Sequence, residues 1–189
     1  MNRYARVLIA SNEIENAIYY YEKIINESSE LELKSRFQLS KLYQTIGKKK
    51  EALNALNIRG FNNKYLNIKR AFIYLQFEEY ANALVSLDRE EENLCNYEVR
   101  ESIDDNYINQ EENYIRGHIF YRRGQLNKAI PYLKKTLVVK GRMYYVNAYL
   151  DLASIHIMRY EIDDAINICE ELLKNTKSEE AIKKINHIM

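Results

Sequence analysis

Histidines and cysteines are the residues of this sequence best suited to metal or redox chemistry, so their spacing decides which chemistry is open to the chain. His118, His156 and His187 each lack a metal-ligating residue four positions further on, the spacing that places two ligands on one helix face. Cys95 and Cys169 are spaced like neither a zinc motif nor a redox motif. We therefore expect no catalytic residue, no metal and no cofactor, and we expect His156 and Cys169 to be packing residues.

Charge is distributed unevenly along a chain that is close to neutral overall. The 189 residues carry a net charge of +1, which gives no general attraction to nucleic acid or to anionic membranes. Residues 88–112, however, contain ten acidic residues against Arg89 and Arg100, a net charge of −8. We expect a basic partner, or a neighbouring copy of the chain, to dock on this acidic segment with salt-sensitive affinity.

Basic and apolar residues narrow the choice of partner further. The pairs Arg122–Arg123 and Lys134–Lys135 lie in different segments and form no basic stripe, so we expect no nucleic-acid partner. No apolar run approaches the roughly 18 residues of a membrane span. Val7–Ala10 is too short for the core of a signal peptide. The sequence thus predicts no membrane partner and a cytoplasmic location.

Helical periodicity governs the elements that must position these residues. Only five Gly and one Pro interrupt the chain, which favours long helices with short connections. Apolar faces include alanines at intervals of 35, 31, 46 and 36 residues, which indicates stacked helical hairpins and an all-α fold. These alanines are Ala17, Ala52, Ala83, Ala129 and Ala165.

The predicted elements form a single domain that spans residues 1–189. Its hairpins cover residues 1–27, 33–60, 64–92, 104–141 and 144–175, and a capping helix covers residues 177–188. Gly60 and Asn62–Asn63 mark a loop between the second and third hairpins. The long interval contains an acidic irregular insert at 88–112, where we favour a lengthened helix beginning near Asp104 over a disordered linker.

The alanines belong to a four-residue pattern that resembles the tetratricopeptide repeat. In that family a small residue in the first helix is followed three positions later by an aromatic one, and an Ala in the second helix is followed four positions later by a bulky one. The resemblance covers most of the chain and implies a right-handed α-solenoid of antiparallel hairpins with a C-terminal capping helix. The matching residues, hairpin by hairpin, are Ala5, Leu8, Ala17 and Tyr21; Ser40, Tyr43, Ala52 and Leu56; Ala71, Tyr74, Ala83 and Leu87; Gly117, Phe120, Ala129 and Leu133; and Ala153, His156, Ala165 and Cys169.

The resemblance also implies a ligand-binding surface, because three positions on the first helix of each such hairpin line a concave groove. Most of the matching residues here are aromatic or aliphatic, which suits an amphipathic helix or an apolar peptide. The paired basic residues with which chaperone-binding members hold a terminal carboxylate are not reproduced. The groove residues carried over are Phe37, Lys41 and Gln44; Ile68, Phe72 and Leu75; Tyr114, His118 and Tyr121; and Leu150, Ser154 and Ile157.

The function that the resemblance implies is a non-enzymatic protein-interaction module or scaffold that binds a peptide or helix in this groove. An alternative is the repeat portion of a bacterial peptide-sensing regulator that lacks its DNA-binding domain. The occupant of the groove is also open at this point. Besides a separate partner, a second copy of the chain, which would give a homo-oligomer, or the chain's own acidic segment would fill it.

Overall fold

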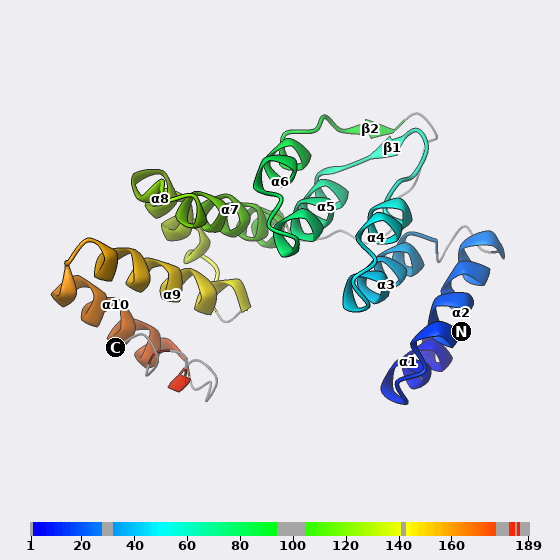
Figure 1. Cartoon of the computed structure of the whole chain (residues 1–189), viewed down its shortest axis with the longest axis horizontal. Coiled ribbons are helices and arrows are strands. Elements are labelled where there is room, and N and C mark those ends of the chain that lie inside the picture. The colour runs from blue at the N-terminus through cyan, green and yellow to red at the C-terminus, as the bar shows by residue number, and fades with distance from the viewer. Residues whose placement is uncertain are drawn as a thin grey trace. The chain divides into compact units, whose positions relative to one another are not determined.

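The structure is a computed structural model that describes residues 2–27, 32–93, 105–140, 143–176, 182–183 and 185. The chain divides into two compact units, Met1–Tyr97 and Glu98–Met189, and each is described by itself. In both, the described helices follow one another as antiparallel pairs, so the all-α prediction is confirmed (Figure 1). That residues 1–189 form one domain stays a prediction.

The first unit contains three described hairpins and a small β-ribbon. Leu8 of the first helix and Tyr21 of the second are buried in the core of the first hairpin, which continues into Leu42 of the next hairpin. A second core joins Ala52 and Leu56 to Leu66 and Ile73. The elements are α1 (Asn2–Ala10), α2 (Ile14–Glu27), α3 (Glu32–Thr45), α4 (Lys49–Ala55), β1 (Phe61–Asn62), α5 (Lys64–Gln76), α6 (Tyr80–Leu87) and β2 (Glu92–Asn93).

The second unit contains the fourth and fifth described hairpins. Its helices are α7 (Asp105–Arg122), α8 (Leu126–Thr136), α9 (Met143–Met158) and α10 (Ile162–Asn175). Leu133, Leu152 and Ile155 are buried where α7 and α8 meet α9. Ile185, from the region predicted as a capping helix, is buried against Tyr145 and Leu172, while most of residues 177–188 lies outside the described residues.

Each of the five described hairpin turns has the same backbone. The second residue after the first helix has a positive φ, between 58° and 73°, and the amide of the residue after it donates to the carbonyl five positions earlier. In the last hairpin, for example, the Glu161 amide donates to the His156 carbonyl at 2.9 Å. This is a Schellman motif, which satisfies carbonyls at the end of a helix. The left-handed residues are Asn12, Gly47, Glu78, Gly124 and Tyr160.

The turns fix the register of the packing residues. The small residue of the first helix lies seven positions before the left-handed residue in each described hairpin, and it is buried every time: Ala5, Ser40, Ala71, Gly117 and Ala153. The alanine of the second helix lies five positions after the left-handed residue and is buried as well. Small residues at these two positions let the paired helices approach closely.

A two-stranded antiparallel ribbon stands where the sequence predicted only a loop at Gly60 and Asn62–Asn63. Strand β1 pairs with β2, with Asn62 opposite Glu92. The ribbon closes over Arg70 of α5, whose guanidinium is buried and donates to Asn62 Oδ1 at 2.5 Å and to the Leu56 carbonyl at 2.6 Å. The loop prediction was wrong here, because side chains distant in sequence supply the hydrogen bonds that hold the ribbon.

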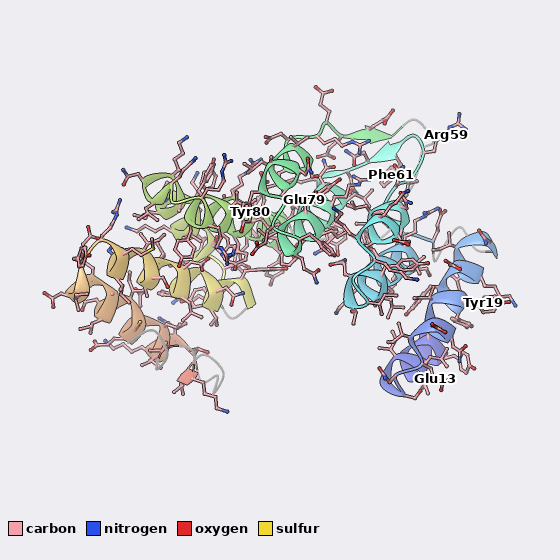
Figure 2. All side chains as sticks on the ribbon, viewed as in Figure 1. Glu13, Tyr19, Arg59, Phe61, Glu79 and Tyr80 are labelled. Carbon is pink, nitrogen blue, oxygen red and sulfur yellow. The ribbon has the colours of Figure 1, made fainter. Side chains whose placement is uncertain are left out.

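No described helix is both long enough and apolar enough to span a membrane. Exposed apolar side chains are scattered over the described surface, and Tyr19 on α2 is a clear case, with 70% of its surface exposed (Figure 2).

Candidate functional site

The predicted groove residues lie on the first helices of the second to fifth described hairpins, which are α3, α5, α7 and α9. On α3, Phe37 is half-buried and meets Tyr65 of α5 edge to face, with ring centroids 4.7 Å apart. Lys41 is exposed, and the Gln44 amide turns back to the Ser40 carbonyl at 3.3 Å. The residues of α3 therefore present a mixed surface of one ring, one cation and one amide.

Helix α5 places its three predicted groove residues differently. Phe72 and Leu75 are half-buried, but Ile68 is only 1% exposed. Leu66 and Asn67 are buried as well, and three consecutive residues of a helix point in three different directions. More than one side of α5 is therefore covered by other parts of the protein at residues 66–68. Ile68 is a core residue in the structure, which corrects its assignment to a ligand-facing surface.

Helix α7 brings its three predicted residues together in one row. The Tyr114 ring lies 5.5 Å from the His118 ring, which in turn lies 6.1 Å from the Tyr121 ring. Tyr144 of α9 extends the row, with its ring 5.3 Å from that of Tyr114. Tyr114 is buried, whereas the other three rings are partly exposed.

A short contact between His118 and Asp151 holds the middle of this row in place. His118 Nδ1 lies 2.7 Å from Asp151 Oδ2, which links α7 to α9. Burial and then the Asp151 carboxylate raise the pKa of the Tyr114 phenol above its ordinary value. We refer to Tyr114, His118, Tyr121, Tyr144 and Asp151 as the α7–α9 cluster.

Asp151 was not among the residues predicted for the site. Its side chain is only 13% exposed, and it is the single Asp or Glu of α9. A carboxylate requires a partner when it is buried. That requirement is the sequence signal that would have found it, although the partner, His118, is 33 residues away.

The remaining predicted residues lie further along α9. Leu150, Ser154 and Ile157 are half-buried, and the Ser154 hydroxyl donates to the Leu150 carbonyl at 2.9 Å. The structure therefore gathers the α7 residues into a cluster but leaves the α9 residues as a separate, mainly aliphatic strip.

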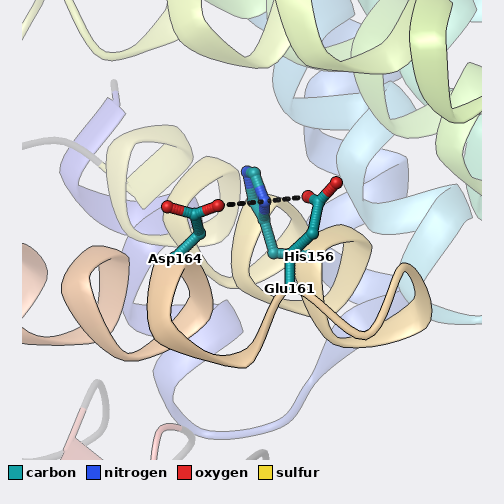
Figure 3. A group of neighbouring side chains, drawn as sticks. All are labelled: His156, Glu161 and Asp164. Carbon is teal, nitrogen blue, oxygen red and sulfur yellow. Dashed lines mark hydrogen bonds and ion pairs between the residues drawn. The ribbon is translucent and has the colours of Figure 1, made fainter.

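The α9–α10 turn holds a second group of polar side chains that the sequence analysis did not connect. His156 Nδ1 lies 2.6 Å from Glu161 Oε2 and 3.9 Å from Asp164 Oδ2 (Figure 3). The repeat pattern predicts a packing role for His156, because His156 occupies an aromatic position of that pattern and has no ligand-type residue four positions on. Its partners stand five and eight positions on, across the turn, where helical spacing does not apply.

Two further predictions concern Cys169 and the acidic segment. Cys169 is buried and free, and burial raises the pKa of its thiol, which disfavours the reactive thiolate. The start of the acidic segment, residues 88–92, is exposed. Residues 94–104, with Cys95, lie outside the described residues, and docking of a basic partner on the segment stays a prediction.

Comparison with known proteins identifies the fold of the chain. No model of a known protein family matches the sequence, and no curated protein matches it. Solved protein structures do match. The crystal structure of MamA superposes with a TM-score of 0.64 at 17% identity, covering 90% of this chain and 93% of that one.

A second match names the repeat. The crystal structure of YrrB, described as a TPR protein with an unusual peptide-binding site, superposes with a TM-score of 0.57 at 16% identity, covering 95% of this chain and 86% of that one. The chain therefore has a tetratricopeptide-like repeat fold, as its resemblance to that repeat implied. The apo form of the quorum sensor NprR from B. thuringiensis gives a TM-score of only 0.43 at 16% identity, covering 98% of this chain and 66% of that one.

Proposed function

We propose that this protein is a non-enzymatic protein-interaction module that binds a peptide or a helix on the first helices of its hairpins. The observation that carries the proposal is the α7–α9 cluster. It combines three partly exposed rings with a polar pair, His118 and Asp151, held 2.7 Å apart on facing helices. Aromatic rings supply contact area at low entropic cost, and a fixed polar pair selects the register of a ligand.

The chemistry of this surface favours an amphipathic ligand. Rings of Tyr121 and Tyr144 offer apolar contact to aliphatic or aromatic side chains, whereas the His118–Asp151 pair offers hydrogen bonds to a backbone or an amide. The first unit has half-buried apolar side chains of its own on α5, Phe72 and Leu75, which offer the same type of contact. The proposal assigns none of these residues a catalytic role.

The structural neighbours support this type of function without naming a partner. YrrB, described as having a peptide-binding site, has the same repeat fold. Repeat proteins of this class stack hairpins into extended surfaces on which a peptide can lie. Binding a peptide is accordingly the simplest function for the fold of this chain.

Selection from a displayed peptide library tests the proposal. Peptides enriched on the purified chain are synthesised and their dissociation constants are measured against the wild type, Tyr121→Asp and Phe72→Asp. We expect Tyr121→Asp to weaken about tenfold or more the binding of peptides that occupy the second unit, and Phe72→Asp to do so for peptides that occupy the first, because an unpaired charge enters an apolar contact. Tyr19→Asp, which changes an exposed tyrosine of α2, is the matched control.

Two results would overturn the assignment of the surface. Either no peptide is enriched above background, or the enriched peptides bind Tyr121→Asp and Phe72→Asp as tightly as the wild type while helix content by circular dichroism is unchanged. If the peptides instead bind Tyr19→Asp more weakly than the wild type, the binding surface lies on α2.

A further inference from the structure

The turn between α9 and α10 departs from the other described turns at two positions at once. The first position lies four residues before the left-handed residue. It is apolar or aromatic in four turns, as Leu8, Tyr43, Tyr74 and Phe120, but it is His156 in the last. An imidazole there replaces a packing side chain with one that can ligate a metal ion.

The second departure concerns the residues one and four positions after the left-handed one. In the first and third turns these are a Glu and an Asn, and the Asn amide donates to the Glu carboxylate: Asn16 to Glu13 and Asn82 to Glu79, each at 2.8 Å. The second turn has Lys48 and Glu51 and the fourth has Gln125 and Lys128. Among the described turns, only the last brings two carboxylates together.

Those two carboxylates, Glu161 and Asp164, face the imidazole of His156. All three side chains offer a ligand atom within 4.8 Å of one another, and the imidazole lies between the two carboxyl groups (Figure 3). In the first and third turns an Asn side-chain amide donates a hydrogen bond to the Glu carboxylate. In the last turn the position of that Asn is occupied by Asp164, a second carboxylate. The His156 ring makes a close contact with Glu161, at 2.6 Å, but not with Asp164, at 3.9 Å, and a cation bound between the three groups would balance both carboxylates.

We propose that His156, Glu161 and Asp164, the His156 cluster, bind a divalent transition-metal ion, for which Zn²⁺ is the representative. One imidazole nitrogen and two carboxylate oxygens are ordinary zinc ligands, and water completes a tetrahedral shell. Mg²⁺ and Ca²⁺ prefer shells made of oxygen, so an imidazole among the ligands selects against them.

The distances suit such an ion. Ligand atoms bound to one tetrahedral Zn²⁺ lie about 3.3 Å apart at ordinary bond lengths. The separations from His156 Nδ1 are 2.6 Å to Glu161 and 3.9 Å to Asp164, one shorter and one longer than this value. Asp164 is 64% exposed and free to move inward by rotation of its side chain. Arg159 approaches the other oxygen of Glu161, Oε1, at 3.9 Å, which leaves Oε2 for the ion.

A bound ion would act as a clip on the last hairpin. His156 lies in the last turn of α9, Glu161 immediately precedes α10, and Asp164 lies in the first turn of α10. The ion would bind the folded turn and not the unfolded chain, in which the three ligands are separated. Metal binding would therefore stabilise the folded state of the last hairpin. This inference is independent of the peptide-binding surface proposed above, since it concerns the opposite end of α9 from Tyr144.

The experiment titrates the full chain with ZnCl₂ and measures the heat of binding by calorimetry and the melting temperature. The same titrations with MgCl₂ and CaCl₂ run in parallel. We expect one Zn²⁺ per chain in the specific phase, a rise in melting temperature that EDTA reverses, and no response to Mg²⁺ or Ca²⁺. Binding should weaken as the solution is acidified, because protons compete for the ligands.

Variants identify the ligands. His156→Phe restores the aromatic type that other repeats carry, and Asp164→Asn restores the residue of the first and third turns, so both variants should fold. We expect each to weaken Zn²⁺ binding about tenfold or more. Asp163→Asn, a neighbouring acid of the same helix turn outside the cluster, should leave this affinity unchanged.

Three outcomes would overturn the proposal. The first is no specific Zn²⁺ phase in the wild type, and the second is a phase that survives in both His156→Phe and Asp164→Asn. The third is a dependence of stability on pH that these variants remove while Zn²⁺ has no effect, which would show that a proton alone balances the two carboxylates.

Discussion

Gly117 of α7 packs so closely on Leu133 of α8 that a Cβ atom at Gly117 would lie 2.8 Å from Leu133 Cδ2 and 3.1 Å from the Leu133 backbone nitrogen. Real Cβ atoms do not approach other heavy atoms to 2.8 Å. The other described hairpins hold Ala or Ser at this position. The fourth hairpin therefore has a closer helix crossing than a side chain of even one carbon permits.

Gly117→Ala should destabilise the protein despite the higher helix propensity of alanine. The propensity gain is about 1 kcal/mol, whereas forcing a methyl group into a packed core costs about 1–3 kcal/mol. We expect a net loss of about 1 kcal/mol in the free energy of unfolding, measured by urea denaturation. Ala71→Gly, at the equivalent position of α5, is the comparison and should also destabilise, for the opposite reason. A more stable Gly117→Ala would show that α7 and α8 separate without cost.

Tyr160→Gly should stabilise the protein, because Tyr160 has a φ of 61° and its side chain is 90% exposed, so little packing is lost. A left-handed conformation costs a residue with a Cβ about 1–2 kcal/mol, part of which the greater freedom of glycine in the unfolded chain offsets. The expected gain is about 0.5–1 kcal/mol in urea denaturation. Gly47→Ala, the reverse change at a φ of 73° with open space around it, should lose a similar amount. Equal stability of both variants and the wild type would mean that these turns are unstrained.

These turns also show how far the sequence predicts the structure. Gly47 and Gly124 are visible as turn residues because glycine tolerates a positive φ. Asn12, Glu78 and Tyr160 adopt the same backbone without that signal. The alanines nevertheless placed the hairpins in register, because small residues at helix crossings recur with the period of the repeat. Local, periodic features of the fold could therefore be read from the chain.

Features formed between distant residues could not be read in the same way. The two-residue strands β1 and β2 are too short to show any periodicity. His118 and Asp151 come from different hairpins, and the sequence offered only a lone acid in an apolar helix as a hint. Ile68 was placed on the ligand-facing side by its position in the repeat, but additional packing around α5 buries it.

Alkaline pH should destabilise the contact between α2 and α3, where the Tyr43 hydroxyl donates to Glu22 Oε1 at 2.8 Å. Burial, followed by that carboxylate, raises the pKa of Tyr43 from 10.0 to about 12. A phenol whose folded pKa is raised contributes stability that is fully present below pH 10 and is lost as pH rises towards 12. Because Tyr43 is partly exposed, we expect a contribution of only about 1 kcal/mol.

Tyr43→Phe tests that contribution. The variant lacks the ionisable group, so its free energy of unfolding should fall less steeply than that of the wild type between about pH 10 and 12. Tyr19→Phe, which removes an exposed hydroxyl from α2, should keep the wild-type slope. Parallel pH profiles for the wild type and Tyr43→Phe would refute the coupling of Tyr43 to Glu22.

Arg70→Met should release the β1–β2 ribbon. The buried guanidinium donates to the Leu56 carbonyl and to Asn62 Oδ1, and Asn62 in turn donates to the Glu90 carbonyl at 2.6 Å. Methionine fills a similar volume but leaves these acceptors unsatisfied, at a cost of about 1–3 kcal/mol for each buried group. We expect a loss of about 2–4 kcal/mol in unfolding free energy.

Hydrogen exchange locates the effect of that substitution. In Arg70→Met the amides of Phe61 and Asn62 should exchange faster, while those of α9 in the other unit keep the wild-type rate, because the acceptors of Arg70 lie in the first unit. Arg70→Lys retains the charge but lacks the forked geometry that reaches two acceptors at once, so it should give an intermediate result. Unchanged exchange at Phe61 and Asn62 in both variants would show that backbone pairing alone holds the ribbon.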